Sequence, residues 1–162
     1  MQLSFRNFTD DDVGYMTFRQ AEIFEEVSGF ASEGWRDYII GEVREFIDRF
    51  DAEKDRVFIL EADGVRSGCM AVTHRENNAA QLRFLFIEPD LRGSGIGSRM
   101  FGMAVDFCRS KGYDLVFLWT VSHLRAARRI YADHGFHITE TKDNDDWGTH
   151  VLEERWDLDL RG

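Results

Sequence analysis

The stretch EPDLRGSGIGSRM, residues 88–100, lies between an apolar run and a new helical pattern. It contains three glycines, one proline and two arginines. Glycines let the backbone turn sharply and let an anion come close to the main-chain amides. Free N–H groups at a helix N-terminus, with the helix dipole behind them, bind phosphate. The stretch therefore predicts a phosphate-binding loop leading into a helix, with a glycine-rich connection that binds nothing as the alternative.

Two common phosphate-binding motifs do not fit this loop. A dinucleotide fingerprint needs G-x-G-x-x-G, but Gly93 and Gly95 are followed by Ser98 at the third glycine position. A Walker loop needs Gly-Lys-Ser/Thr, whereas Gly97 is followed by Ser98 and Arg99. A nucleotide-binding protein is therefore only a remote hypothesis.

The charge distribution supports an anion site around the loop. The chain has a net charge of −10, which argues against general nucleic-acid binding because that requires a basic face. Residues 81–130, however, carry 8 basic and 4 acidic side chains. The alternative is that these positive charges gather by chance on a solvated face.

Length and composition predict one domain, residues 1–162, with a sizeable core, since 43% of the residues are hydrophobic. No apolar segment is long enough for a membrane span, and the N-terminus lacks a secretory signal pattern. Cys69 and Cys108 lie in apolar patterns without metal-ligand spacing. We therefore expect a cytoplasmic protein with neither disulfide nor metal site.

Periodicity and turn residues predict an α/β fold. The expected order is a strand, two helices, three strands, a helix, a strand, a helix and two strands. Short connections make the three central strands an antiparallel meander. We expect a mixed, mostly antiparallel sheet flanked by about four helices. The strands are predicted at 2–8, 56–64, 65–74, 80–88, 113–120, 136–141 and 149–160, and the helices after Thr9, from about 35, from Ile96 and from Ser122.

Two motifs in this order resemble the GNAT N-acetyltransferases. Arg92-x-x-Gly95-x-Gly97, after a strand ending Ile87-Glu88-Pro89, is similar to the family's acyl-CoA signature. The segment LRAARRIYADHGF, residues 124–136, resembles the later segment N-x-x-A-x-x-x-Y-x-x-x-G-F. The stretches at 14–26 and 147–160 look most like the acetyltransferase half of MarR–GNAT fusion proteins, and 162 residues leave no room for their DNA-binding half.

The resemblance implies acetyl-CoA as the acyl donor, with no metal. It implies that Phe86 and Ile87 offer backbone groups to pantetheine, which lies along the strand as an added strand would. It also implies that main-chain amides hold the pyrophosphate. These belong to Arg92, Gly93, Ser94, Gly95, Ile96, Gly97 and Ser98.

The resemblance also implies that Tyr131 protonates the departing thiolate. A phenol with an ordinary pKa of about 10 keeps its proton at neutral pH and can donate it. Its position alone is more typical of an aromatic residue packed in the core, and the two motifs together favour the catalytic role.

Two positions depart from the family pattern. Leu124 stands where many members have an asparagine that contacts the cofactor, and Gln81 stands where several have a catalytic glutamate. Because glutamine cannot act as a base, another group or ordered water must take the proton. Glu154 is the candidate base because strand alternation puts it on an apolar face. A position at a bulge, facing solvent, is the alternative. His123 is a weaker candidate.

The resemblance implies direct transfer of acetyl to a primary amine of a small molecule or protein, with a non-catalytic acyl-CoA-binding module as the alternative. The acceptor itself is not identified. Several acidic residues could belong either to a solvated surface or to a site for a cationic amine. They are Glu22, Glu25, Glu26, Asp143, Asp145 and Asp146. Three tryptophans could either pack in the core or line a pocket: Trp35, Trp119 and Trp147. Homodimerisation through the closing strands is compatible with the sequence.

Overall fold

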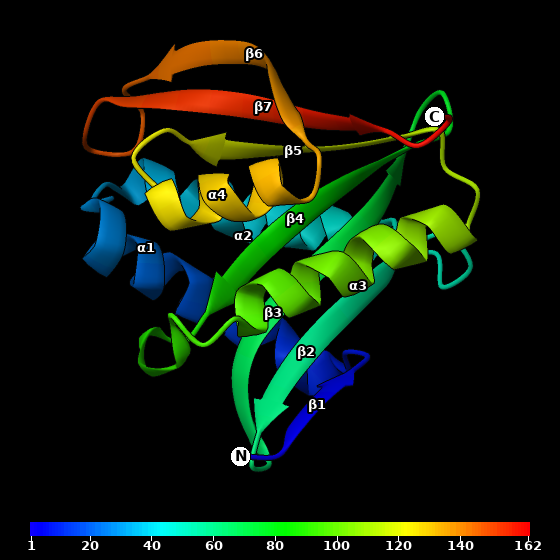
Figure 1. Ribbon diagram of the computed structural model, residues 1–162. Coiled ribbons are helices and arrows are strands. Elements are labelled where there is room, and N and C mark those ends of the chain that lie inside the picture. Colours follow the sequence, from blue (N-terminus) through cyan, green and yellow to red (C-terminus); the bar gives the residue numbers. More distant parts are fainter.

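The computed structural model describes residues 1–162 and contains one seven-stranded sheet (Figure 1). The strand order is β1-β2-β3-β4-β5-β7-β6, and only β4 and β5 run parallel. The predicted mixed, mostly antiparallel sheet is confirmed. The strands are β1 (Leu3–Arg6), β2 (Arg56–Ala62), β3 (Val65–Arg75), β4 (Ala79–Ile87), β5 (Leu115–Val121), β6 (His137–Asn144) and β7 (Val151–Asp159).

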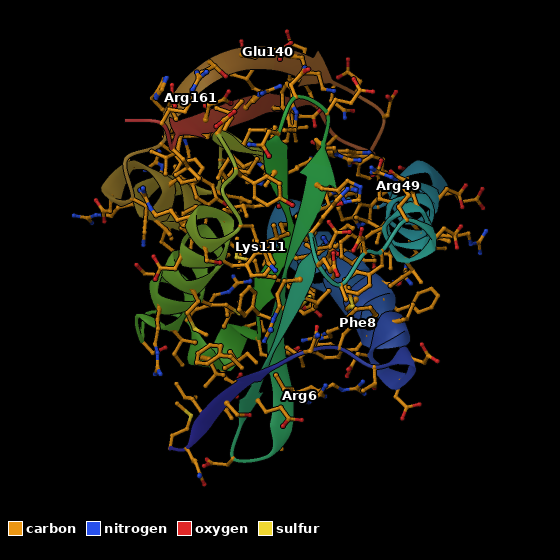
Figure 2. All side chains as sticks on the ribbon, turned by 90° about the vertical axis from the view of Figure 1, so that its right-hand side faces the viewer. Arg6, Phe8, Arg49, Lys111, Glu140 and Arg161 are labelled. Carbon is orange, nitrogen blue, oxygen red and sulfur yellow. The ribbon has the colours of Figure 1, made fainter.

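Four α-helices cover the sheet, as predicted. They are α1 (Gln20–Ser28), α2 (Glu33–Asp48), α3 (Ile96–Ser110) and α4 (Arg125–Asp133). Figure 2 shows α1 and α2 on one side of the central strands and α3 and α4 on the other. None of these helices combines the length and the apolar character needed to cross a membrane.

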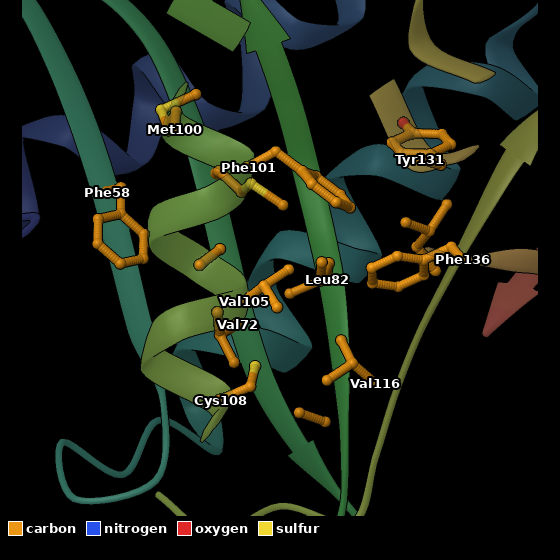
Figure 3. Close-up of a cluster of buried hydrophobic side chains, with 14 of the residues drawn as sticks. Phe58, Val72, Leu82, Met100, Phe101, Val105, Cys108, Val116, Tyr131 and Phe136 are labelled. Atoms are coloured by element: carbon orange, nitrogen blue, oxygen red, sulfur yellow. The ribbon is translucent and has the colours of Figure 1, made fainter. Parts of the chain in front are cut away.

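The sheet separates two hydrophobic clusters because successive side chains of a strand point to opposite faces. In β2, Phe58 and Leu60 join the cluster beneath α3 and α4, while Val57 and Ile59 join the one beneath α1 and α2. Figure 3 shows the first cluster, in which α3 packs against β4 and against Tyr131 and Phe136. Because the central strands carry apolar side chains on both faces, helices must cover both faces of the sheet.

Both cysteines lie in these clusters, one in each. Cys69 and Cys108 are buried and carry free thiols, as the apolar patterns around them predict. Burial raises the pKa of both thiols, so they stay protonated at neutral pH.

The first helical segment starts less regularly than its apolar pattern predicts. After Thr9 the chain forms a short 3-10 turn over Asp10–Asp12 and a π-helical turn over Tyr15–Arg19 before α1 begins. The capping box between Thr9 and Asp12 is present. The prediction of a helix start at Thr9 is therefore right in place, although the first turns are not α-helical.

The predicted start of the last helix at Ser122 is wrong. The Ser122 N–H donates to the carbonyl oxygen of Leu152 in β7 at 2.9 Å, so this residue is still bound to the sheet. A turn closed by Leu124 N–H on the carbonyl oxygen of Val121 follows, and α4 begins at Arg125. A sheet hydrogen bond therefore overrides the capping preference of serine.

A buried carboxylate ties the N-terminal strand to the first turn. Asp12 is 1% exposed and accepts from Arg6 Nη1 at 2.7 Å, from Arg6 Nη2 at 3.0 Å and from Thr9 N–H at 2.8 Å. The Arg6 guanidinium lowers the pKa of Asp12 to about 2, against the opposing effect of burial. Because the pKa is lower in the folded state, this pair stabilises the fold above the ordinary aspartate pKa.

We expect Asp12→Asn to lower the free energy of unfolding at pH 7 by about 2 kcal/mol, since a depression from 3.8 to about 2 corresponds to that energy. The parent should lose this contribution as the pH falls from about 4 to about 2, and the variant should lack this loss. Urea unfolding across that range measures it. Asp11→Asn is the matched control, because the exposed Asp11 side chain makes no ion pair. Equal pH dependence in parent and Asp12→Asn would contradict the prediction.

Candidate active site

A cavity opens where β4 and β5 separate. The two strands pair only between Ala79–Gln81 and Leu115–Phe117, and Figure 1 shows them spreading apart toward their carboxyl ends. The cavity has a volume of about 790 Å³ and is lined from both strands and from all four α-helices. Parallel strands that part leave one edge of each without a partner, so this opening can accept an extended ligand.

A bulge in β4 shapes one wall of the cavity. The register with β3 shifts between Cys69 and Ala71, and Phe84 adopts a φ of +57° opposite this shift. A non-glycine residue at positive φ marks local strain, which occurs at functional sites. As a result the consecutive residues Arg83 and Phe84 both reach α2, Arg83 through Glu42 and Phe84 through Phe46.

Phe86 and Ile87, which the resemblance assigns to pantetheine, line the cavity. They end β4, where they pair with Cys69 and Gly68 of β3 on one side only. Their other edge faces the opening toward β5. The backbone at this edge is available to a ligand that lies along the strand.

The glycine loop lies at the carboxyl end of β4, and all seven residues predicted to hold pyrophosphate, Arg92 through Ser98, line the cavity. Gly93 and Gly95 have φ of +77° and +81°, a region that favours glycine. The first helical bond of α3 runs from Arg99 N–H to the carbonyl oxygen of Gly95 at 3.1 Å. The N–H groups from Gly93 to Ser98 donate to no protein acceptor. They therefore form a cradle that fits a pyrophosphate group.

The two arginines of the loop differ in position. Arg92 lines the cavity and is exposed, whereas Arg99 lies outside the lining with its guanidinium carbon 5.0 Å from the centre of the Phe5 ring. The first turn of α3 directs Arg99 toward β1, so Arg92 is the arginine of the loop that lines the cavity.

Glu88 fixes the start of the loop. Its carboxylate accepts from Tyr15 Oη at 2.8 Å and from Arg19 Nε and Nη2 at 3.0 and 2.8 Å. Burial would raise the pKa of Glu88, but Arg19 and Tyr15 hold it below its ordinary value. This network joins the end of β4 to the turn before α1, so the two walls of the cavity are held together.

Tyr131 of α4 lines the cavity and is 6% exposed. Its ring centre lies 5.2 Å from that of Phe101 and 5.9 Å from that of Trp156. Burial raises the pKa of Tyr131 to about 12, and the Thr120 hydroxyl partly opposes this shift. The phenol therefore keeps its proton at neutral pH and can serve as a donor inside the cavity.

The positions that depart from the family pattern also line the cavity. Gln81 accepts from Arg75 Nε through Oε1 at 2.9 Å. Leu124 lies at the start of α4 and supplies no side-chain cap. The His123 Nε2 lies 2.8 Å from Ser28 Oγ. Gln81 is thus held by a structural contact, and no carboxylate replaces it on β4.

Glu154 is buried, so the alternative that it faces solvent is wrong. Arg128 Nε and Nη2 donate to its two carboxylate oxygens at 2.9 and 3.2 Å, and Trp156 Nε1 donates to Oε1 at 3.2 Å. Glu154 is not among the residues that line the cavity. Its neighbour Glu153 points to the other face of β7 and lines the cavity.

The part of the cavity between α1, α2 and β7, here called the acceptor half, lies away from the glycine loop. Trp35, Trp119 and Trp147 all line it, and the acidic surface residues named from the sequence do not. Sequence analysis missed five polar residues of this half. They are Gln20, Tyr38, Glu42, Arg83 and Glu153. The one sequence signal is that Tyr38 and Glu42 lie on the same helical face as Trp35 and Ile39.

The comparisons with known proteins show the family of this chain. The model of the acetyltransferase (GNAT) family matches residues 20–136. An uncharacterised N-acetyltransferase of Methanocaldococcus jannaschii is 28% identical over 94 residues, which are 54% of this chain and 42% of that protein. An amino-acid acetyltransferase of Shewanella oneidensis is 28% identical over 99 residues, which are 60% of this chain and 21% of that protein. The chain thus spans less than half the length of these two relatives.

Solved structures share the fold over nearly the whole chain. A GNAT-family acetyltransferase from Staphylococcus aureus has a TM-score of 0.80 at 13% identity, covering 98% of this chain and 99% of that one. A Salmonella typhimurium structure, described as an acetyltransferase with its cofactor acetyl-CoA, has a TM-score of 0.74 at 15% identity and covers 99% and 95%. At such identities the likeness shows the fold, while the family model covers well over half of the chain. The chain belongs to the acetyltransferase (GNAT) family.

Proposed function

We propose that the protein is an acetyl-CoA-dependent N-acetyltransferase that moves acetyl directly to a primary amine of a small molecule or protein. One observation carries the proposal. The unpaired amides of the glycine loop and the protonated phenol of Tyr131 line the same cavity. A site with both can hold a pyrophosphate and donate a proton to a thiolate.

The part of the cavity lined by the end of β4 and by the glycine loop, here called the donor half, has a role for each of its predicted residues. The amides from Gly93 to Ser98 hold the pyrophosphate of coenzyme A, with Arg92 adding positive charge. Phe86 and Ile87 bind pantetheine through their backbone. Acetyl-CoA, when bound, supplies the acetyl group as a thioester. Holding it there leaves the acceptor half free for the amine, so the two substrates meet at the splayed strands.

Tyr131 donates its proton as the C–S bond breaks and the thiolate leaves. The proton that the amine loses as the C–N bond forms passes through ordered water and restores the phenol. Direct transfer is supported by the lining, which includes no cysteine that could carry the acetyl group. Cys69 and Cys108 are buried thiols with raised pKa values, which makes them poor nucleophiles. The retained tyrosine also disfavours a module that only binds acyl-CoA.

The role of Glu154 as proton acceptor stays a prediction, and its surroundings favour a different task. Its ion pair with Arg128 and its bond from Trp156 brace α4, which carries Tyr131. We therefore propose Glu154 as a residue that positions Tyr131. The narrower resemblance to MarR–GNAT fusion proteins, the cytoplasmic location and homodimerisation also stay predictions.

A broad panel of amines and peptides, with detection of the thiol released from acetyl-CoA, tests the proposed function. We expect at least one primary amine to give a thiol release rate that saturates with amine and scales with enzyme. Mass spectrometry should find the acetyl group on that amine. Tight binding of acetyl-CoA with no release on any member of the panel would instead support a binding module.

A further inference from the structure

We propose that the acceptor half takes a primary amine with a single positive charge on an aromatic body, and that Glu153 binds its ammonium group. The inference rests on the proposed function and names the class of acceptor for the same site. It is carried by three features of the acceptor half: an unevenly compensated carboxylate, a wall of fixed aromatic rings and a buried amide oxygen without a partner.

Of the charged groups of the acceptor half, two already neutralise each other. Arg83 is ion-paired with Glu42, and Glu45 lies 3.8 Å from its other terminal nitrogen. The Arg83 guanidinium therefore has its counter-ions on α2. The Arg83 Nη1 makes no hydrogen bond, but a carboxylate that bound it would lie close to the charges of Glu42 and Glu45.

Glu153 is less well compensated. Its side chain is 9% exposed, and both of its polar contacts use the same oxygen: Asn144 Nδ2 donates to Oε2 at 3.1 Å, and Lys142 Nζ lies 3.7 Å from Oε2. No protein group donates to Oε1. Lys142 is 58% exposed, so water screens its charge. A buried carboxylate with one free oxygen is a binding group for an ammonium ion.

The wall of the acceptor half is aromatic and rigid. The ring centre of Trp147 lies 5.1 Å from that of Trp35 and 5.1 Å from that of Tyr38, while Phe30 lies 4.8 Å from Trp35. The Trp35 indole donates to the carbonyl oxygen of Ala21 at 3.2 Å, so its polar atom is already satisfied. Such a wall favours a flat apolar body and gives no counter-ion to a second cation.

Gln20 is the third feature. It is the first residue of α1, lines the cavity and is 6% exposed, and its Oε1 has no hydrogen-bond partner. A buried acceptor left unsatisfied costs about 1–3 kcal/mol. A hydrogen bond from the N–H group of a bound ligand would remove this cost. The cavity lining therefore includes a carboxylate on β7 and an unsatisfied amide oxygen on α1.

The test uses three probes that differ in the proposed features. They are 2-phenylethylamine, phenylalanine, which adds a carboxylate to the same skeleton, and spermidine, which has several charges and no ring. We expect kcat/KM for 2-phenylethylamine to exceed the values for the other two by about tenfold or more. Phenylalanine brings its carboxylate close to Glu42 and Glu45, and spermidine buries a second cation without a counter-ion. A preference for phenylalanine or spermidine would overturn the inference and leave acetyl transfer intact.

The second arm uses Glu153→Gln, which keeps the shape and removes the charge. We expect KM for 2-phenylethylamine to rise roughly 10- to 100-fold, with the Kd of acetyl-CoA unchanged. Glu140→Gln is the matched control, since Glu140 is exposed on β6 and lies outside the cavity (Figure 2). An unchanged KM in Glu153→Gln would overturn the inference.

A binding measurement separates the two proposals. Calorimetric titration of 2-phenylethylamine into the protein saturated with coenzyme A should give a Kd that Glu153→Gln weakens. If the amine binds in this way but is never acetylated, the proposed function fails and the acceptor half still has the assigned chemistry. If neither binding nor transfer is seen with this amine while other amines are acetylated, the assignment of the acceptor class fails alone.

Discussion

Replacing Tyr131 by Phe should lower kcat by about 10²- to 10⁴-fold, the range that a positioned general acid contributes. The substitution removes one hydroxyl and keeps the ring that packs on Phe101 and Trp156. Without the phenol, the thiolate must leave unprotonated or take its proton from water. The Kd of acetyl-CoA should stay within about twofold, because the variant loses an interaction made only in the transition state. Single-turnover kinetics and calorimetry measure the two quantities.

Tyr113→Phe is a matched control for this prediction. Tyr113 is also buried, and burial raises its pKa to about 12, but it lies outside the cavity and donates to the carbonyl oxygen of Lys54 at 2.6 Å. Its loss should reduce stability by about 1 kcal/mol and leave kcat unchanged. Full activity in Tyr131→Phe, or an equal loss in Tyr113→Phe, would count against a catalytic role of Tyr131.

The second large effect is expected at the glycine loop. Gly95→Val should weaken acetyl-CoA binding by about 10- to 100-fold, because a non-glycine residue at φ +81° carries a strain of about 1–3 kcal/mol. No heavy atom lies within 4 Å of an added Cβ at Gly95, so the effect comes from the backbone conformation and not from a clash. The loop relieves the strain by leaving the conformation that aims its amides into the cavity. Calorimetry with coenzyme A measures the affinity.

Ser94→Ala is the control in the same loop. The Ser94 hydroxyl donates to the carbonyl oxygen of Leu91 at 2.5 Å, so it contributes to the turn and not directly to the cradle of amides. We expect a change in affinity of about threefold or less, because a neutral hydrogen bond on the surface contributes little. An effect of Ser94→Ala as large as that of Gly95→Val would mean that side chains, not amides, hold the phosphate.

The sequence predicted well those features that depend on residues close together in the chain. The loop at 88–100 combines glycines, a helix start and neighbouring arginines within 13 residues, so its anion-binding chemistry is visible without the fold. Tyr131 belongs to a motif with fixed spacing on one helix. The periodic apolar positions of α2 and α3 likewise predict both the helices and the faces that are buried.

Failures occurred where a distant partner decides the outcome. Ser122 has the composition of a helix cap, but Leu152 on β7 holds its backbone in the sheet. The sequence also does not show which arginine of the loop faces the cavity, and the Arg99 guanidinium lies over the ring of Phe5 on β1. In both cases the neighbour that decides the outcome is at least 30 residues away in the chain, so local sequence preferences cannot predict the contact.

The protein's sequence by itself determines the α/β order of elements, the glycine loop and the tyrosine of α4, because each depends on local backbone preferences or fixed spacing. Only the tertiary structure decides the acceptor half. Gln20, Arg83 and Glu153 come from α1, β4 and β7, and they line one cavity because β4 and β5 separate after Gln81. The position of that separation depends on the bulge at Phe84 and on strand pairing across the sheet. Strand alternation places Glu153 and Glu154 on opposite faces of β7. Only the packing of α4 shows that Glu154 binds Arg128 while Glu153 lines the cavity.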